Sequence, residues 1–276
     1  MRRHHVDAAG PPDREAENDW EVVGLLGGAS LEGVQMAGFR DRAAAGLDMQ
    51  VLPQPAVVVV ISLGEAPMTV VGADEPRAMR SFIASLAPGP TRIRGEGVEC
   101  VEVNLSPRAA HALLGVSPRG LEGSITGLED LWGPQARRLG ERLTEATTWQ
   151  ERLALTDGFL ARRTVGARPM SPEVAAAWDT IVARRGRVRV SALAESFGWS
   201  RQRLWSRFTD QIGVTPKRAA VLVRFDHAAR ALRAGDSVGD TALACGYVDQ
   251  SHLHRDVQAL AGCTPGELAG RATSAG

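Results

Sequence analysis

The first part of the chain alternates short apolar runs with turn residues. Residues 56–61 form a β-branched run that ends before Gly64, and shorter apolar runs lie at 68–71, 81–86, 91–94 and 98–103. Glycine and proline separate these runs. Several short strands with frequent turn signals predict a small β-barrel or sandwich. Residues 20–39 are expected to add edge strands.

Beyond residue 105 the apolar residues recur at helical spacing. The steps Ser106-Pro107 and Ser171-Pro172 each place a capping serine before a proline, which predicts helices from residue 108 to 114 and from 172 to 183. Between them, residues 133–163 predict two amphipathic helices, because Leu and Trp recur every three or four residues and Arg and Glu occupy the other face. The charged stretch around Arg137 to Glu145 is interpreted either as a solvated face or as part of a dimer seam. A linker is expected at 166–169.

The last hundred residues contain an internal repeat. Gly198-Trp199 and Gly246-Tyr247 are 48 residues apart, whereas Thr215-Pro216 and Thr264-Pro265 are 49 apart. The second copy therefore contains one extra residue in its turn. Self-similarity of this kind indicates a supersecondary unit that is used twice.

Each copy predicts a helix, a tight turn and a second helix. The glycine can adopt a positive φ and end the first helix, and the aromatic residue fills the corner. Ser200 or Asp249 is expected to cap the second helix, and Thr264 with Glu267 forms a capping box for the helix that follows. Leu204 and Phe208, like Leu253 and Val257, lie four residues apart and are predicted to face inward. A long helix over 217–232 would join the two units.

This arrangement leaves the outer face of each second helix free to enter a DNA groove. Arginine can pair with guanine, and glutamine with adenine, in the major groove. Two such helices held roughly 34 Å apart could enter successive major grooves on one side of a duplex. The candidate DNA-contacting residues are Arg201, Gln202, Arg203, Trp205, Ser206, Arg207, Gln250, Ser251, His252, His254 and Arg255. The alternative is an all-helical bundle with solvated arginines, which a pattern repeated in register argues against.

The repeat resembles the AraC/XylS family of transcription regulators over about residues 190–271. The matching residues include Arg224, Ala228, Leu232, Ala244, Gly246-Tyr247, Asp249, Ser251-His252-Leu253, Gly262 and Thr264-Pro265. The resemblance implies a seven-helix DNA-binding domain with a linker helix. It also implies base contacts from Gln202, Trp205 and Ser206 in the first unit and from Gln250, Ser251, His254 and Arg255 in the second. The sequence departs from the family at Val257 and Leu253, where phenylalanine is common, and at Trp205, where a polar residue is common.

The N-terminal half is similar to the sensor halves of some members of this family. The similarity lies in the valine strand, in Asn104-Leu105-Ser106-Pro107, and in the segment from Leu131-Trp132-Gly133 to Glu141-Arg142-Leu143. It implies a cupin-like β-barrel followed by dimerisation helices.

Charge and composition add little to this picture. The net charge is zero, but residues 171–276 contain 14 Lys+Arg and 10 Asp+Glu, so the C-terminal half is the basic one. The three cysteines, Cys100, Cys245 and Cys263, are widely spaced and are expected to be small buried apolar residues. No apolar run is long enough for a membrane helix, and residues 1–18 lack a secretory signal, so a cytoplasmic protein is expected.

No enzyme chemistry is expected from the sequence. A cupin metalloenzyme needs converging histidines, and residues 51–103 contain none. Neither a nucleophile elbow nor a phosphate-binding loop is present, and no cofactor or metal is expected.

The predicted architecture is α+β, with a cupin-like β-barrel or sandwich and following helices, then an all-α domain with two helix-turn-helix units. The expected domains are a disordered N-terminus at 1–18, a β-rich sensor-like domain at 19–131, a helical dimerisation or connector segment at 132–165 and a DNA-binding domain at 171–276. The predicted function is sequence-specific regulation of transcription, with double-stranded promoter DNA, a small-molecule effector, a second copy of the chain and RNA polymerase as partners. The alternative is a sensor or interaction protein without base-specific DNA readout.

Overall fold

The computed structural model describes residues 20–42, 46–64, 66–72, 75–86, 89–121, 123–167 and 169–273. The predicted disorder at 1–18 lies outside these residues. The strands are β1 (Trp20–Gly24), β2 (Val34–Asp41), β3 (Leu47–Val51), β4 (Val57–Ser62), β5 (Met68–Val71), β6 (Arg77–Met79), β7 (Phe82–Ala84), β8 (Thr91–Gly95), β9 (Glu99–Leu105) and β10 (Ile125–Gly127). The helices are α1 (Pro107–Leu113), the 3₁₀ helix η1 (Pro118–Leu121), α2 (Leu128–Trp132), α3 (Pro134–Glu145), α4 (Trp149–Arg163), α5 (Pro172–Ala183), α6 (Val190–Glu195), α7 (Arg201–Ile212), α8 (Pro216–Arg233), α9 (Val238–Ala244), α10 (Gln250–Ala261) and α11 (Pro265–Thr273).

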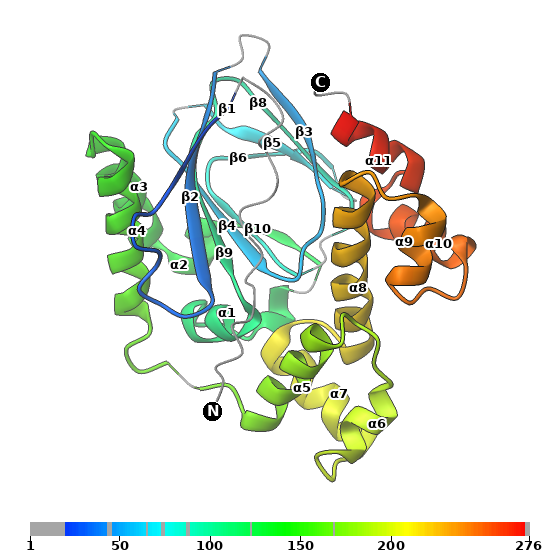
Figure 1. Ribbon diagram of the computed structural model, residues 1–276. Helices are drawn as coiled ribbons and strands as arrows, with labels where there is room; N and C mark the ends of the chain where they lie inside the picture. The colour runs from blue at the N-terminus through cyan, green and yellow to red at the C-terminus, as the bar shows by residue number, and fades with distance from the viewer. Residues whose placement is uncertain are drawn as a thin grey trace.

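The strands form two antiparallel sheets, as the short alternating runs predict. One sheet has the order β1-β2-β9-β4-β7-β10 and the other has the order β3-β8-β5-β6. All pairings are antiparallel. The N-terminal domain is therefore a β-sandwich, and its larger sheet has helices on its outer side (Figure 1).

The valine run of β4 explains how the larger sheet is buried on both faces. Successive side chains of a strand point to opposite faces. Val57, Val59 and Ile61 belong to the core shared with the helices, whereas Val60 belongs to the core shared with the smaller sheet. A continuous apolar run is what a strand covered on both sides requires.

Helix α4 is attached to the larger sheet through Trp149 and Arg152. The Trp149 ring lies against the backbone of Gly38 in β2, where an added Cβ would fall 2.2 Å from the ring. Arg152 pairs with Glu99 of β9, which also accepts a hydrogen bond from Arg40 at 2.7 Å. Burial alone would raise the pKa of Glu99, but the hydrogen bonds from Arg40 and Arg152 outweigh burial and hold its pKa below the usual value. This ion-pair network holds α4 on the sheet.

Several short elements differ from the prediction. β3, β6, β10 and α2 were not anticipated, and the strand expected over 81–86 is limited to β7, Phe82–Ala84. These elements are three to five residues long. Such segments are too short to show a period, so pairing with neighbours decides their conformation. The two helices expected over 133–163 are present as α3 and α4. All three cysteines are buried, as predicted, and in the described part of the chain none of them forms a disulfide bond.

Candidate DNA-binding surface

The two predicted helix-turn-helix units are formed by α6–α7 and α9–α10. Gly198 (φ 65°) and Gly246 (φ 74°) both have the positive φ that the predicted turns require. α7 and α10 each contain 12 residues. Both helices end at a left-handed glycine, Gly213 or Gly262. The extra residue of the second turn is Val248, which is 87% exposed.

The predicted caps start both second helices. The Ser200 hydroxyl accepts a hydrogen bond from the backbone N–H of Arg203 at 3.2 Å, and the Asp249 carboxylate accepts one from the N–H of His252 at 2.7 Å. The capping box of α11 is also present, because Thr264 N–H donates to Glu267 at 2.7 Å and Glu267 N–H donates to the Thr264 hydroxyl at 3.2 Å. Local sequence signals therefore set the first turn of each of these helices.

Helix α8 joins the two units as a single linker helix, between the α5–α7 group and the α9–α11 group (Figure 1). Arg224 of α8 pairs with Asp256 of α10 at 2.9 Å, and both side chains are largely buried. The Arg224 guanidinium also lies 4.6 Å from the centre of the Tyr247 ring. Burial raises the pKa of Tyr247 to about 12, so its hydroxyl stays protonated at neutral pH. Arg224 thus anchors the turn and the second helix of the second unit to the linker.

The faces opposite the buried residues are open to solvent. Leu204 and Phe208 of α7 and Leu253 and Val257 of α10 are completely buried, as predicted. The exposed candidate residues are Arg201, Gln202, Arg203, Trp205 and Arg207 on α7, and Gln250, Ser251, His254 and Arg255 on α10. Ser206 and His252 are half-buried. Val257 is completely buried although it is smaller than the phenylalanine that is common at this position in the family that the sequence resembles.

Three candidate residues make contacts with aromatic rings within the protein. Arg203 stacks on the Trp199 ring at 4.6 Å. His252 packs edge-on against Tyr247, with ring centres 5.2 Å apart, and lies 3.9 Å from Asp256. Trp205 lies 5.9 Å from the guanidinium of Arg119 in η1. These contacts favour a structural role for His252 and leave Gln250, Ser251, His254 and Arg255 as the solvent-facing group on α10.

Both recognition helices contact the sandwich domain at their C-terminal ends. At the end of α7, Arg119 pairs with Asp210 at 3.1 Å and the Ser117 hydroxyl donates to the Asp210 carbonyl at 2.9 Å. Gly213 faces Pro118 so closely that an added Cβ would lie 2.9 Å from the proline carbonyl oxygen. At the end of α10, the equivalent Gly262 faces Pro90, at 3.1 Å from an added Cβ. The first turns of α7 and α10, which begin at Arg201 and Gln250, lie at the opposite ends of these helices.

The sequence did not reveal Arg119, Asp210 or Asp256 as contributors to this surface. Asp256 lies four residues after His252, and a helix would place both on the side that meets α8. The four-residue spacing of His252 and Asp256 is therefore the sequence feature that could have revealed Asp256. The contacts of Arg119 join positions far apart in the chain, so no local pattern marks them.

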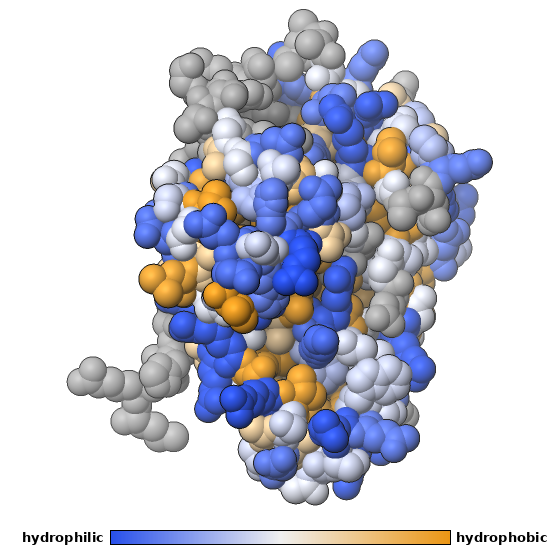
Figure 2. All heavy atoms as spheres, turned by 90° about the vertical axis from the view of Figure 1, so that its right-hand side faces the viewer, coloured by the Kyte–Doolittle hydropathy of each residue, from blue (hydrophilic) through white to orange (hydrophobic). Residues whose placement is uncertain are grey.

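The side of the molecule that includes α8–α11 is predominantly hydrophilic (Figure 2). Its hydrophobic patches are small and separate. A surface without a large apolar patch suits a polar partner better than a permanent protein interface. Within the described residues, no group of three or more His, Cys, Asp or Glu side chains could hold a metal ion. None of the described helices is long and apolar enough to cross a membrane.

Comparison with known proteins agrees with this geometry. Residues 193–271 match the protein family described as a helix-turn-helix domain. A segment of 66 residues is 36% identical to the HTH-type transcriptional regulator YbfI of Bacillus subtilis (strain 168), which is 24% of each chain. The chain thus spans about a quarter of the length of this curated relative.

Solved structures match this chain at low sequence identity, among them the following two. ToxT from Vibrio cholerae O395 has a TM-score of 0.48 and 10% identity, over 88% of this chain and 99% of that one. The C-terminal domain of AraT, a response regulator from Geobacillus stearothermophilus, has a TM-score of 0.35 and 19% identity, over 37% of this chain and 87% of that one.

Two helix-turn-helix units on one linker helix, attached to a β-sandwich, define a class of two-domain proteins with a tandem helix-turn-helix module. Within this arrangement, residues 193–271 are the part that matches the helix-turn-helix domain family. The helix-turn-helix units predicted from the sequence are therefore confirmed, and the relative that matches this segment is described as a transcriptional regulator.

Proposed function

We propose that the protein is a sequence-specific regulator of transcription that binds promoter DNA through α7 and α10. The observation that supports this most directly is the pair of exposed, capped helices at equivalent positions of a repeat. Both are held by α8 and both have arginine or glutamine in their first turns. Such side chains can pair with base edges in the major groove.

The proposed base-contacting residues are Arg201, Gln202, Trp205, Ser206, Gln250, Ser251, His254 and Arg255, with Arg203, Arg207 and His252 beside them. The proposed domain boundaries are those expected from the sequence, with a sensor-like domain at 19–131, a connector or dimerisation segment at 132–165 and a DNA-binding domain at 171–276. We assign the sandwich domain to the sensing of a small effector or to pairing with a second copy. Contact with RNA polymerase and a place in the cytoplasm follow from the same proposal.

The proposal is tested by recovering bound fragments from sheared genomic DNA with the purified full chain. The tightest-binding fragments are then titrated against random duplexes of the same length. We expect recovered fragments to bind at least a thousandfold more tightly than random DNA at physiological salt, and both affinities to fall as salt is raised. Equal affinity for recovered and random DNA would instead support the alternative of a sensor protein without base-specific readout.

A further inference from the structure

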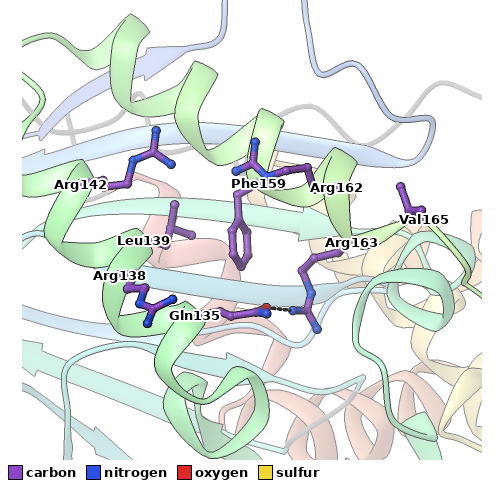
Figure 3. A pocket seen from close by; sticks show the side chains of 8 residues that line it. All are labelled: Gln135, Arg138, Leu139, Arg142, Phe159, Arg162, Arg163 and Val165. Carbon is purple, nitrogen blue, oxygen red and sulfur yellow. Dashed lines mark hydrogen bonds between the residues drawn. The ribbon is translucent and has the colours of Figure 1, made fainter.

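A groove of about 550 Å³ lies between α3 and α4, on the side of the molecule away from the helix-turn-helix units (Figures 1 and 3). Leu139, Phe159 and Val165 supply its apolar surface, and the Phe159 ring projects between the two helices. The polar residues that line it are Gln135, Arg138, Arg142, Arg162 and Arg163. Its size is within the range of small-molecule sites.

The charge of this groove is entirely positive. Four of its eight lining residues are arginines and none is acidic. Throughout the described part of the chain, Arg138, Arg142 and Arg162 form no ion pair, whereas Arg152 of α4 pairs with Glu99. Four guanidinium groups without an acidic partner repel one another, and a bound anion would relieve that repulsion.

The Arg163 side chain is held in place at one end of the groove. Its Nε donates to the Leu113 carbonyl at 3.0 Å, and its Nη1 donates to the Gln135 side chain at 2.8 Å. Its guanidinium also lies 4.6 Å from the centre of the Trp132 ring. Burial lowers the pKa of Arg163, which shows that its charge is partly removed from water. A guanidinium held in this way needs no reordering to bind a carboxylate or similar anion.

A second copy of the chain is the competing occupant, because α3 and α4 were expected as dimerisation helices. Pairing of the groove with itself would place arginines of one copy against arginines of the other. Like charges brought together at an interface cost free energy. The groove therefore fits a small anion better than a second copy of itself.

We propose that this groove binds a small organic anion with an apolar, flat body, and that this ligand is the effector of the regulator proposed above. The apolar body would lie on Leu139 and Phe159, and the anionic head would pair with Arg138 and Arg142. The effector role rests on the proposed function, whereas the binding site does not.

The position of the groove connects it to the DNA-binding domain. Val165 lines the groove and belongs to the segment that leads from α4 to α5. Arg163 holds the end of α1, and α1 packs against the recognition helix α7. A ligand that changes the position of Arg163 or Val165 would thus act on two of the connections between the sandwich and the first helix-turn-helix unit.

The binding site is tested with 8-anilinonaphthalene-1-sulfonate, which joins an anionic head to a flat apolar body and fluoresces in apolar sites. The full chain is titrated with this probe and with N-phenyl-1-naphthylamine, its neutral counterpart. The variant Arg138→Gln/Arg142→Gln removes two charges of the groove. Arg137→Gln is the matched control, because Arg137 is an exposed neighbour on α3 that does not line the groove. We expect the double variant to weaken sulfonate binding at least tenfold, the control to leave it unchanged, and the neutral probe to bind at least tenfold more weakly than the sulfonate.

The proposed anion site would be contradicted if the sulfonate bound equally well to the double variant and the original chain. It would also be contradicted if the two probes bound equally well. Loss of self-association in the double variant, measured by analytical ultracentrifugation, together with unchanged probe binding would assign the groove to a second copy instead. Circular dichroism melting shows whether each variant folds.

The effector role is tested by measuring DNA affinity with and without saturating probe. At least a threefold change in the original chain and none in the double variant is expected. Probe binding without any change in DNA affinity would overturn the effector role alone. If no DNA preference is found at all, the proposed function fails while the probe titration still decides the site.

Discussion

Replacing Arg224 by methionine is expected to lower the free energy of unfolding by about 3 kcal/mol, because it leaves the carboxylate of Asp256 largely buried without its partner. The Arg224 and Asp256 side chains are only 15% and 18% exposed, and their contact distance is 2.9 Å. The same substitution removes the cationic group that lies over Tyr247. The second helix-turn-helix unit would lose its main polar attachment to α8.

The loss of stability in Arg224→Met should result from breaking the Arg224–Asp256 ion pair and not from the loss of one charge. In Arg224→Met/Asp256→Leu both partners become apolar, and most of the lost stability should return, since a buried ion pair often contributes little net stability relative to apolar residues of similar size. Arg92→Met is the matched control, because the Arg92–Asp48 pair is about half exposed and solvent screening should leave it little effect on stability. Urea unfolding followed by circular dichroism measures the free energy of unfolding of all three variants. A loss in Arg224→Met no larger than in Arg92→Met would show that the pair does not anchor the second unit.

Replacing Arg255 by alanine is expected to weaken binding to a recovered genomic fragment by about 1–3 kcal/mol, which is roughly a fivefold to 150-fold rise in Kd. Arg255 is exposed on α10, and its only polar contact among the described residues is a long 3.4 Å hydrogen bond to the Ser251 carbonyl. The guanidinium is therefore free to pair with a guanine in the major groove. Arg255→Ala should also relax the preference for one base pair of the site.

Measuring the loss of affinity on both the recovered fragment and random DNA distinguishes a contact to a base from a contact to a phosphate. A residue that pairs with a base should lose affinity on the recovered fragment and little on random DNA, whereas a phosphate contact weakens both alike. Arg137→Ala removes one exposed positive charge from α3 and should leave both affinities unchanged. Fluorescence anisotropy at one fixed salt concentration measures these values. An equal loss on both DNAs would remove Arg255 from the base-contacting group.

Much of the C-terminal domain could be predicted because its determinants are local. A glycine with positive φ ends the first helix of each unit, and a serine two residues later or an aspartate three residues later caps the second helix. The inward-facing pairs Leu204–Phe208 and Leu253–Val257 follow from helical spacing alone. The one-residue difference between the copies correctly indicated an extra turn residue, which is Val248.

Other features depend on contacts between distant parts of the chain. Gly186 shows this: its positive φ suits a turn, but its main constraint is the Ala220 carbonyl, which would lie 2.1 Å from an added Cβ. The packing of Gly213 on Pro118 and of Gly262 on Pro90 is equally invisible in a local pattern. The arginine groove is a third case. Periodicity placed Arg138 and Arg142 on one face of a helix, but it could not show that Arg162 and Arg163 face them from α4.

The central claim is that one linker helix positions two recognition helices for the same duplex. Hydroxyl-radical footprinting of the full chain on the tightest-binding genomic fragment tests it most directly. We predict two protected segments on one face of the DNA, with centres about 10 base pairs apart, because helices of a tandem unit enter successive major grooves. Arg255→Ala should weaken protection in only one of them. A single protected segment, unaffected by substitutions in one of the two recognition helices, would contradict the account.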